Sequence, residues 1–334
     1  MKALISTKHF NLSNTYPFSE GKVRDIYNLD EQLLIIATDR ISAFDHVLPT
    51  PVPGRGIVLT EMTVNWIDLL TKDIANLKTK LPITNHLVHT DVGELPEIFH
   101  PFADELTGRF MVVEKCDPIP AELIIRGNIT GSLWKAYKKA VKENPEATTV
   151  NILGHELPTD LQESEEFPHP LFTPSTKAEA GQHDENISYE QMVIIFTEWL
   201  KNKEYDVTAE DLAISCLDLS LMLFTKARDK AKKLGIIIAD TKFEFGLKVV
   251  EGILYLVIID EILSSDSSRY WPADEFAIGK SQNSYDKQIV RDYLSKELEW
   301  DGTLPIPVIP DEIVKQIIDR YQECMTILFD ENLD

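Results

Sequence analysis

The sequence predicts an α+β protein with two lobes, a β-rich N-terminal lobe and a mixed α/β C-terminal lobe. Short apolar runs of strand length, separated by polar turns, dominate residues 1–115, whereas helical patterns alternate with strand-like runs over residues 116–334. A chain of 334 residues also corresponds to roughly two domains of about 150 residues each. We place the boundary between the lobes near Cys116-Asp117-Pro118.

The composition limits the classes of partner. Acidic residues number 55 against 33 basic residues, a net charge of −22, and such a surface repels the phosphate backbone of nucleic acids. No apolar run is long enough to cross a membrane. The three cysteines lie far apart, which argues against a disulfide framework or a zinc cluster and fits a reducing compartment. We therefore expect a cytoplasmic protein without nucleic-acid or membrane partners. The net charge does not exclude a small anionic ligand, which responds to the local field in a cleft.

The N-terminal lobe begins with a hairpin signal, since two apolar-rich runs flank the polar turn Asp30-Glu31-Gln32. A Pro/Gly-rich loop follows, and apolar residues at helical spacing then indicate a helix. The elements expected in this lobe are strands 23–29 and 33–38, the loop 49–56, a helix 60–70 and a strand 110–114, and a further strand 121–126 follows the boundary.

The C-terminal lobe carries longer helices. Thr208 and Asp211 form a capping-box pattern, and Gly235 ends the helix that they begin. Residues 145–174 are acidic and punctuated by proline, and a long stretch without structure is more often functional or an insertion than neutral filler. The elements expected here are a helix 132–143 with Ser132 as its N-cap, helices 188–202 and 208–234, strands 236–246 and 253–260, and helices 284–298 and 311–329.

Residues 21–25 (GKVRD) combine a glycine with two cations. Side chains alternate along a strand, so Lys22 and Arg24 share one face, while Gly21 lets a ligand approach the backbone. Taken alone, the pattern favours an exposed strand with solvated charges, and a lid over polyphosphate is the functional alternative.

Two further polar segments lie where side chains can reach a site. Residues 38–45 (TDRISAFD) end a strand, a position that often carries function. Their alternative interpretation is turn chemistry with a surface ion pair between Asp39 and Arg40. Residues 172–186 form a polar patch ahead of a helix, where residues from Asp184 to Ser188 could equally be helix-start chemistry.

Residues 126–132 (RGNITGS) place an arginine at the end of an apolar run and Ser132 at the start of a helix. The free N–H groups of a helix N-terminus suit phosphate, and arginine adds a bidentate donor. The alternative is that Ser132 only caps the helix and Arg126 pairs with a carboxylate. Residues 266–272 offer hydroxyls and a guanidinium for the same kind of anion.

Residues 238–246 (IADTKFEFG) are the most informative segment. Alternation puts Asp240, Lys242 and Glu244 on one face of a strand that the preceding apolar run marks as interior. Three charges on one face of an interior strand are costly unless they line a polar cavity or bind ions. A structural salt-bridge ladder is the alternative.

The return strand ends at Asp260, and its register decides which residue faces Glu244. A three-residue loop centred on Gly252 sets Glu244 opposite Asp260, whereas a two-residue loop puts them on opposite faces. In the first register two carboxylates converge and offer only oxygen ligands. Mg²⁺ prefers such ligands, with nucleotide phosphate and water completing its shell.

Seven segments of this chain resemble SAICAR synthetase and occur in the same order. They are GKVRDIY, TDRISAFD, RGNITGSLWKAY, PLFTPSTKAEAGQHDENIS, IADTKFEFG, DEILSSDSSRYWP and SYDKQIVRDYL. Each motif is short, but the ordered set is specific and spans residues 21–294. The segment near residues 145–174 resembles the longer, yeast-type form. One departure is Asn128, where the family pattern leads us to expect an aromatic residue.

The resemblance implies an activity and completes the fold. The implied reaction joins L-aspartate to the carboxylate of a carboxylated aminoimidazole ribonucleotide (CAIR), depends on ATP and Mg²⁺, and gives SAICAR, ADP and phosphate in purine biosynthesis. The implied C-terminal lobe is ATP-grasp-like, with ATP in the cleft between the lobes. ATP can convert the carboxylate to an acyl phosphate, so the reaction needs no covalent enzyme nucleophile. We expect a monomer rather than a dimer.

The resemblance also implies roles for the matching residues. The ATP phosphates would be covered by Gly21, Lys22 and Arg24, adenine would be contacted by Glu114 and Lys115, and Mg²⁺ would be held by Glu244 and Asp260. The 5′-phosphate of CAIR would be bound by Arg126, Ser132 and Arg269. The reacting end of CAIR and the charge that develops there would be contacted by Asp240, Lys242 and Lys22. The substrate side of the cleft would be lined by Ser42 and Asp45. We expect aspartate at the patch that contains Lys177 and Asp184.

Two other functions compete with this one. A small-molecule kinase with the same cleft would need no second substrate besides its phosphate acceptor, and a nucleotide-sensing module would need no catalysis. The anion site formed by Arg126, Ser132 and Arg269 implies a phosphorylated acceptor, and the acidic pair argues against a module that only senses nucleotide.

Overall fold

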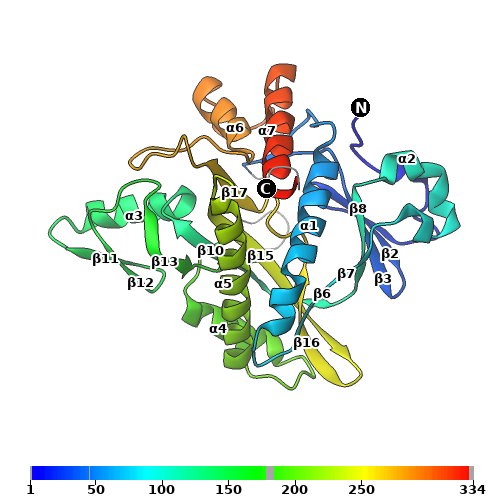
Figure 1. Ribbon diagram of the computed structural model, residues 1–334, viewed down its shortest axis with the longest axis horizontal. Coiled ribbons are helices and arrows are strands. Elements are labelled where there is room, and N and C mark those ends of the chain that lie inside the picture. The colour runs from blue at the N-terminus through cyan, green and yellow to red at the C-terminus, as the bar shows by residue number, and fades with distance from the viewer. Residues whose placement is uncertain (1, 45, 178–183, 331–334) are drawn as a thin grey trace.

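The computed structural model describes residues 2–44, 46–177 and 184–330, which form a smaller and a larger sheet with helices packed between and around them (Figure 1). The smaller sheet has five strands in the order β1-β2-β3-β8-β7. These strands are β1 (Phe18–Glu20), β2 (Arg24–Leu29), β3 (Gln32–Ala37), β8 (Phe110–Glu114) and β7 (Leu87–His89). The hairpin β2–β3 is confirmed, but its turn has two residues, because Gln32 already pairs with Leu29.

The larger sheet has eight strands around the long strand β15 (Ile236–Val250). Its main path is β13-β10-β15-β16-β6, with β14 on β10 and with β9 and β17 on β15. The other bounds are β6 (Ile83–Asn85), β9 (Asp117–Pro118), β10 (Ala121–Asn128), β13 (Glu166–Phe172), β14 (Ser175–Thr176), β16 (Ile253–Ile259) and β17 (Ser268–Pro272). The interior position predicted for the strand that carries Asp240 is therefore confirmed.

Helices cover the larger sheet. In Figure 1, α5 (Ala209–Lys233) crosses β15, and α1 (Arg55–Asn76) runs beside α5 and continues towards α7 (Asp311–Phe329). The remaining helices are α2 (Ala103–Leu106), α3 (Gly131–Glu143), α4 (Tyr189–Leu200) and α6 (Gln288–Asp292), with shorter helical turns at Lys8–Phe10, Val92–Glu94, Glu97–Phe102 and Tyr293–Glu297. None of the helices in the described ranges is long and apolar enough to cross a membrane.

The caps of the helices follow local sequence chemistry. The Thr208 side chain accepts a hydrogen bond from the backbone N–H of Asp211, and Gly235 adopts a left-handed conformation directly after α5, as predicted. Ser188 and Gln191 form a complete capping box at α4. Local sequence signals thus position these two helices well.

Helix α1 begins five residues earlier than predicted because its N-terminus is capped from a distance. The backbone N–H of Gly56 donates to the Asp39 carboxylate at 3.1 Å. A Cβ atom at Gly56 would lie 2.1 Å from the carbonyl oxygen of Ala37, so only glycine lets α1 approach the end of β3 this closely. Neither contact has a signal in the sequence around the helix.

The predicted division of the chain at residue 115 stays a prediction. One apolar cluster, with Phe99 and Phe110 at its centre, belongs to the smaller sheet. The largest apolar cluster joins α1, including Trp66, to α5, α7 and β15. Residues of α1 and β6 therefore pack with the second half of the chain, although they precede residue 115.

The acidic segment 145–174 is more ordered than its composition suggests. It contains the hairpin β11 (Thr149–Ile152) and β12 (His155–Pro158), whose buried side chains pack with Leu133 and Tyr137 of α3. Its last strand, β13, pairs with β10 in the larger sheet. The expectation of a structureless stretch is therefore wrong, because strand pairing satisfies its backbone.

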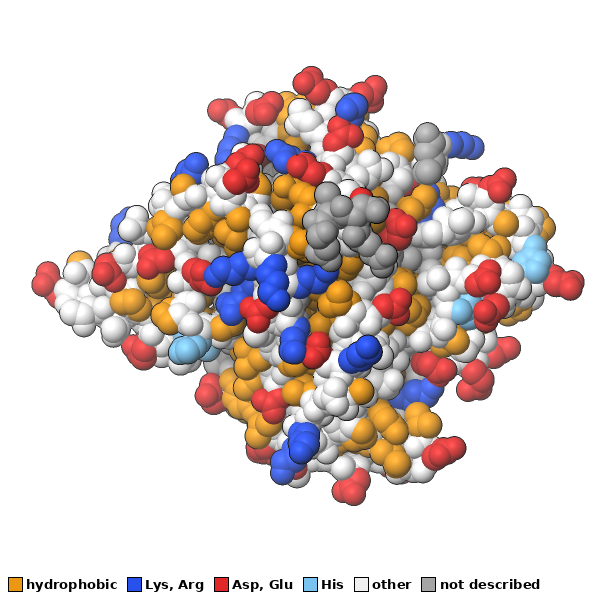
Figure 2. All heavy atoms as spheres, in the orientation of Figure 1, with side chains coloured by type: hydrophobic (Ala, Val, Ile, Leu, Met, Phe, Trp, Pro, Cys, Tyr) orange, Lys and Arg blue, Asp and Glu red, His pale blue; other side chains and the backbone are white. Residues whose placement is uncertain are grey.

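The surface reflects the acidic composition. Figure 2 shows acidic side chains over much of the visible face and basic side chains gathered near its middle, where α5 lies. Lys230, Lys232 and Lys233 lie in the last turn of α5, where cations complement the negative end of the helix dipole.

Candidate active site

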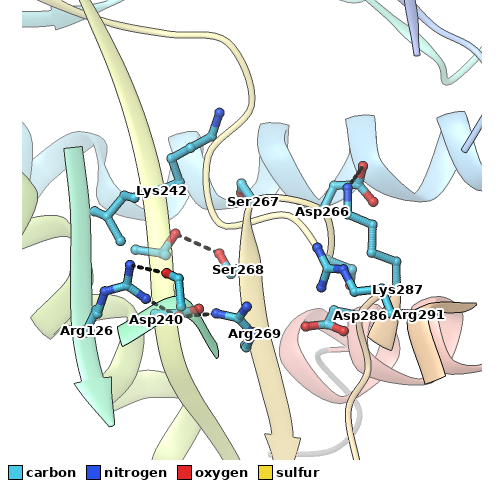
Figure 3. Close-up of a pocket in the computed structure, with 14 residues that line it drawn as sticks. Arg126, Asp240, Lys242, Asp266, Ser267, Ser268, Arg269, Asp286, Lys287 and Arg291 are labelled. Carbon is cyan, nitrogen blue, oxygen red and sulfur yellow. Dashed lines mark hydrogen bonds and ion pairs between the residues drawn. The ribbon is translucent and has the colours of Figure 1, made fainter. Parts of the chain in front are cut away.

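A cavity of about 230 Å³ opens beside the middle of β15 (Figure 3). Its lining residues belong to β10, α3, β15, β17, the loop before β17 and the segment around α6. The lining residues are Ile124, Arg126, Ser132, Asp240, Thr241, Lys242, Ser265, Asp266, Ser267, Ser268, Arg269, Asp286, Lys287 and Arg291. Segments far apart in the sequence therefore meet at one site.

Strand register explains why the charges face one another. In the antiparallel pair β10–β15, Arg126 lies opposite Asp240 and Ile124 lies opposite Lys242. Because side chains alternate along both strands, these residues share one face of the sheet. The predicted common face of Asp240, Lys242 and Glu244 is confirmed, since the Lys242 ammonium also contacts the Glu244 carboxylate at 3.0 Å.

Arg126 and Arg269 share one carboxylate, that of Asp240. Arg126 Nη1 lies 3.3 Å from Asp240 Oδ2, and the Arg269 guanidinium donates to the same oxygen. Arg126 also donates through Nε to Thr173 Oγ1 at 2.7 Å, which fixes the plane of its guanidinium. Burial lowers the pKa of Arg126, and the Asp240 carboxylate raises the pKa of Arg269. Arg126 therefore does pair with a carboxylate, and it also lines the cavity.

Ser132 reaches the cavity from the first turn of α3. The N-cap position belongs to Thr130, so the prediction that Ser132 caps the helix is wrong. The Ser132 hydroxyl instead accepts a hydrogen bond from Arg126 Nη2 at 3.3 Å. A Cβ atom at Gly131, where φ is +58°, would lie 2.7 Å from the Arg269 guanidinium. Glycine thus lets Arg269 approach the start of α3.

The cavity is electropositive within an acidic protein. Among the residues that the structure describes, five basic and three acidic side chains line it, a formal charge of +2 in a chain whose net charge is −22. The basic side chains belong to Arg126, Lys242, Arg269, Lys287 and Arg291, and the acidic ones to Asp240, Asp266 and Asp286. A concave site of this charge attracts a phosphate dianion despite the overall negative charge of the chain.

Beside the cavity, two lysines hold the Glu244 carboxylate. Lys177 Nζ lies 2.5 Å from Oε2, while Lys242 Nζ contacts Oε1 and also lies 2.5 Å from the Glu122 carboxylate. Burial alone would raise the pKa of Glu244, but the ammonium groups of Lys242 and Lys177 outweigh it and lower the pKa to about 2. The carboxylate is therefore ionised throughout the neutral range.

This cluster predicts a pH-dependent contribution to stability. The pKa of Glu244 is about 2 in the folded protein against an ordinary 4.5, so its contribution is complete above pH 4.5 and is lost as the pH falls towards 2. One pKa unit corresponds to about 1.36 kcal/mol, so the contribution is roughly 3 kcal/mol. Urea titrations should show that the difference in unfolding free energy between wild type and Glu244→Gln narrows over this pH range. A difference that stays constant would contradict the lysine pairing.

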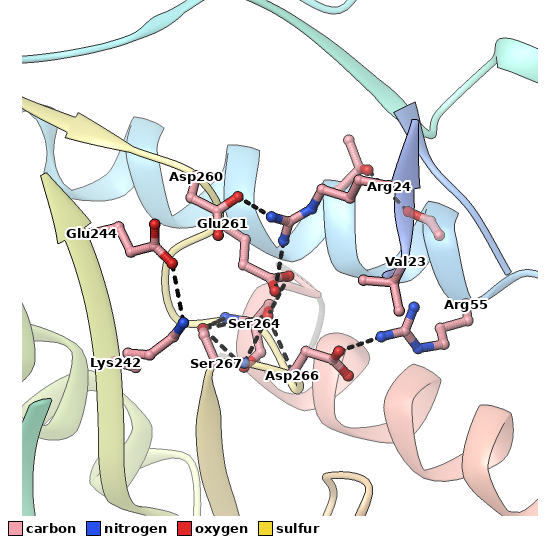
Figure 4. A network of polar contacts seen from close by, with 12 residues as sticks. Val23, Arg24, Arg55, Lys242, Glu244, Asp260, Glu261, Ser264, Asp266 and Ser267 are labelled. Carbon is pink, nitrogen blue, oxygen red and sulfur yellow. Dashed lines mark hydrogen bonds and ion pairs between the residues drawn. The ribbon is translucent and has the colours of Figure 1, made fainter. Parts of the chain in front are cut away.

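Asp260 lies directly after β16, and the strand register is not the one that would place it opposite Glu244. The turn Glu251-Gly252 has two residues, so Glu244 lies opposite Ile259. The strand ends there, because Asp260 adopts a positive φ of 59°. Figure 4 shows Asp260 turned towards Arg24 and Glu244 towards Lys242. The backbone reversal at Asp260, rather than strand alternation, sets the direction of its side chain.

Glu244 and Asp260 offer oxygen ligands of the kind that Mg²⁺ prefers. Both residues offer carboxylate oxygens, and each already attracts a cationic side chain, Lys177 and Lys242 at Glu244 and Arg24 at Asp260. Within the part of the chain that the structure describes, no group of three or more His, Cys, Asp or Glu side chains could hold a metal. Two carboxylates suffice where phosphate oxygens complete the shell.

The smaller sheet meets this site through Arg24, the first residue of β2. Its guanidinium contacts Asp260 and lies 2.6 Å from the Glu261 carboxylate, across the junction between the two sheets. Strand β2 begins at Arg24, so Lys22 lies in the bend before it and the alternation predicted for Lys22 and Arg24 does not apply. The backbone N–H of Gly21 donates to the Arg24 carbonyl at 2.7 Å, which closes this bend.

Arg40 holds the bend in place. Its guanidinium donates to the carbonyls of Gly21 and Lys22, each at 3.0 Å, and pairs with Asp25 at 2.8 Å. The alternative interpretation of this segment, a surface pair between Asp39 and Arg40, is wrong, because adjacent side chains on extended backbone point apart. Asp39 is buried and pairs with Arg109 at 3.0 Å.

Those of the other predicted residues that the structure describes lie outside the cavity lining. Glu114 pairs with Lys248, and Lys115 Nζ lies 2.6 Å from Asn28 Oδ1, both at the junction between the sheets. Ser42 lies half-buried on the short strand β4 (Ser42–Ala43), which pairs with β5 (His46–Val47), and it does not line the cavity. Asp45 falls outside the described residues. Asp184 is exposed, in the same patch as Lys177.

Sequence reasoning missed several charged groups of this site. Glu122 faces Lys242 from β10, and its place could have been inferred from the alternation that includes Arg126. Asp286, Lys287 and Arg291 come from the segment around α6, predicted only as a closing helix. No local signal shows that this segment folds back beside β17.

The SAICAR synthetase family profile matches residues 17–307. The chain belongs to the SAICAR synthetase family. Its activity is that of the family, phosphoribosylaminoimidazole-succinocarboxamide synthesis, a ligase reaction of purine biosynthesis. The resemblance found in the seven sequence segments is therefore confirmed, together with the predicted enzyme class.

Bacterial members of the SAICAR synthetase family match along nearly their whole length. The chain is 44% identical over 317 residues to the phosphoribosylaminoimidazole-succinocarboxamide synthase of Maridesulfovibrio salexigens. The alignment covers 95% of this chain and 94% of that protein. It is 45% identical over 310 residues to the enzyme of the same description from Geotalea uraniireducens, with 93% of each chain covered.

Solved structures of the family share the fold. A structure described as SAICAR-synthase from Saccharomyces cerevisiae complexed with SAICAR has a TM-score of 0.76 and 37% identity, covering 95% of this chain and 96% of that one. A SAICAR synthetase described as in complex with ADP has a TM-score of 0.61 and 22% identity, covering 94% and 98%, and shows the fold alone. The predicted α+β class and the resemblance to the yeast-type enzyme are confirmed.

Proposed function

We propose that this enzyme joins L-aspartate to the carboxylate of CAIR through an acyl phosphate, using ATP and Mg²⁺, and releases SAICAR, ADP and phosphate. The electropositive cavity carries the proposal, because it gathers Arg126, Ser132 and Arg269 beside Asp240 and Lys242. The yeast relative is described as bound to SAICAR and a more distant relative as bound to ADP, which supports a nucleotide acceptor and a nucleotide donor.

The 5′-phosphate of CAIR would bind between Arg126, Ser132 and Arg269. Two guanidinium groups share the single carboxylate of Asp240, so one positive charge stays uncompensated within that group. Charge-assisted hydrogen bonds from two arginines bind a phosphate dianion strongly. The hydroxyl of Ser132 adds a neutral donor at the same place.

The ATP phosphates would lie between the two sheets, near Lys22 and Arg24. Glu244 and Asp260 would hold Mg²⁺, which supplies charge neutralisation at the phosphates when bound. Arg24 contacts Asp260 and Glu261, so its guanidinium lies at the same junction. Glu114 and Lys115, at the other end of the junction, would contact adenine.

The chemistry needs positioning more than it needs a reactive side chain. A carboxylate oxygen of CAIR attacks the terminal phosphorus of ATP, and the bond from phosphorus to ADP breaks. The amine of aspartate then attacks the acyl carbon, loses a proton, and displaces phosphate. Lys242 lies next to the cavity, where its ammonium can stabilise the negative charge that develops on these oxygens. Burial and its two carboxylate partners keep Lys242 in place.

A coupled assay tests this proposal against a small-molecule kinase and a sensing module. ADP release should require CAIR and L-aspartate together with ATP, and SAICAR should form in equal amount. A kinase would release ADP with CAIR alone at the full rate, and a sensing module would release none. Either result would contradict the proposed reaction.

The aspartate site is proposed at the patch of Lys177 and Asp184. Lys177 contacts Glu244, and Asn186 of the same patch lies 3.5 Å from Arg126, so the patch adjoins the cavity. Replacing Lys177 by alanine should raise the KM for aspartate about tenfold, more than the KM for ATP, because one charged hydrogen bond contributes about 1.5 kcal/mol or more. Steady-state kinetics with each substrate varied would measure this. An unchanged KM for aspartate would contradict the assignment.

A further inference from the structure

Asp266 lies where four segments of the chain meet beside the cavity. Its carboxylate accepts a hydrogen bond from the Tyr321 hydroxyl of α7 at 3.0 Å and contacts the Arg55 guanidinium of α1. The ammonium of Lys287, the residue before α6, lies 3.3 Å from the same carboxylate. Asp266 itself belongs to the loop before β17 and lines the cavity.

This group of charges is almost fully removed from solvent. The Arg55 side chain is 0% exposed and the Asp266 side chain 5%. Burial alone would raise the pKa of Asp266, but Arg55 and Lys287 outweigh it and lower the pKa. A buried carboxylate that keeps its charge requires such partners, and removing one partner leaves the other uncompensated.

The backbone turn around Asp266 is also fixed. The backbone N–H groups of Asp266 and Ser267 both donate to the Ser264 hydroxyl oxygen, at 3.1 and 3.2 Å. The Ser264 hydroxyl in turn donates to Glu261 at 2.8 Å (Figure 4). The carboxylate of Asp266 is therefore anchored to the wall of the cavity through its own loop.

Lys287 is the cationic partner of Asp266 that lies at the cavity. It lines the cavity, and its side chain is 15% exposed, whereas Arg55 is fully buried behind the wall. Figure 3 shows Arg126, Asp240 and Arg269 grouped on one side of the site and Asp266, Lys287 and Arg291 on the other. Burial lowers the pKa of Lys287, and Asp266 counteracts this effect.

We propose that Asp266 is a positioning residue, which holds the Lys287 ammonium at the cavity wall so that the anionic acceptor is bound from the side opposite Arg126 and Arg269. The inference rests on the proposed function, in which this cavity binds CAIR. Arg55 and Tyr321 hold Asp266, Asp266 holds Lys287, and Lys287 contacts the substrate anion. No covalent step is involved.

A double-mutant cycle tests this order of contacts. Asp266→Asn and Lys287→Met should each raise the KM for CAIR about tenfold, with kcat and the KM for ATP changed less than about threefold. Because Asp266 acts through Lys287, the double variant should bind CAIR about as weakly as Lys287→Met alone. Calorimetry with inorganic phosphate should show the same order of affinities without turnover.

The controls separate positioning from stability. Asp292→Asn removes a carboxylate from α6 that pairs with the exposed Lys296 at 2.9 Å and accepts a hydrogen bond from Gln288 at 2.8 Å, both outside the cavity lining, and should leave the KM for CAIR unchanged. Tyr321→Phe removes one hydrogen bond from Asp266 and leaves the charges in place, so it provides a milder variant if Asp266→Asn does not fold. It should raise the KM for CAIR about two- to threefold.

Any of three outcomes would overturn the inference where Asp266→Asn folds. They are an unchanged KM for CAIR in Asp266→Asn, an increase in the double variant equal to the product of the two single increases, and an equal rise in the KM of all three substrates. If Asp266→Asn does not fold, an unchanged KM for CAIR in both Tyr321→Phe and Lys287→Met overturns it as well. A wild-type enzyme that formed no ADP with CAIR and aspartate would instead contradict the proposed function.

Discussion

Replacing Glu244 by alanine is expected to abolish turnover at ordinary Mg²⁺ concentrations. Glu244 is one of two carboxylates proposed to hold the metal, and charge stabilisation by a metal ion is worth several kcal/mol in the transition state. We therefore expect kcat to fall by at least about 10³-fold. Asp260→Ala should have the same effect, because two protein ligands leave little redundancy. Initial rates of ADP and SAICAR formation would measure both.

The stability of the Glu244→Ala variant needs its own measurement. Removal of the carboxylate leaves Lys242 with Glu122 as a partner, at 2.5 Å, so the buried ammonium is not left uncompensated. Glu251→Ala, in the exposed turn of the same hairpin, removes the same group away from the site and should keep full activity. A folded Glu244→Ala enzyme that retained more than about a tenth of the wild-type rate would exclude the metal role.

The strand that carries Asp240, Lys242 and Glu244 shows what local pattern can predict. A charged residue at every second position determines the shared face, and the apolar run before Asp240 indicates an interior strand. Both properties depend only on the two-residue period of a strand. The same argument places Glu122 on this face once the register between β10 and β15 is known. That register depends on how the two strands pair in the fold, which the local pattern does not give.

The surroundings of Asp260 show where local pattern fails. Whether a hairpin turn has two or three residues changes which residue faces Glu244, and the sequence Glu251-Gly252 permits either. The positive φ of Asp260 then redirects its side chain towards Arg24, which is 236 residues away in the sequence. Contacts of this range depend on how the two sheets meet, and no periodicity within β2 or β16 encodes that.

The missed cations of the cavity have the same physical origin. Lys287 and Arg291 lie on a short helical segment whose own pattern indicates only a helix near the C-terminus. Their position depends on hydrogen bonds from Ser284 and Tyr285 to the carbonyl of Tyr270, which align this segment with β17. The pairing of Asp39 with Arg109 and of Arg40 with Asp25 likewise depends on strand neighbours rather than on sequence neighbours.

Replacing Arg269 by methionine should raise the KM for CAIR about 100-fold while kcat changes much less. Arg269 and Arg126 both contact Asp240, and the variant leaves Arg126 and Asp240 as a neutral pair, which removes the excess positive charge of that group. A lost charge-assisted contact to phosphate costs roughly 3 kcal/mol, and each 1.4 kcal/mol corresponds to about tenfold in affinity. Steady-state kinetics with CAIR varied would measure the change.

Comparing CAIR with the nucleoside that lacks its 5′-phosphate tests whether Arg269 contacts the phosphate. Wild type should have a lower KM for CAIR than for that nucleoside. If Arg269 binds the phosphate, this ratio of KM values should shrink in Arg269→Met by about the same factor as the KM for CAIR rises. The reason is that the variant loses only the contact that distinguishes CAIR from the nucleoside. Arg320→Met, on the exposed face of α7 where Arg320 pairs with Glu323 at 3.2 Å, should keep the full preference. A rise in KM that is equal for both acceptors would mean that Arg269 contacts the base or sugar instead, and would move the phosphate site to the side of the cavity formed by Lys287 and Arg291.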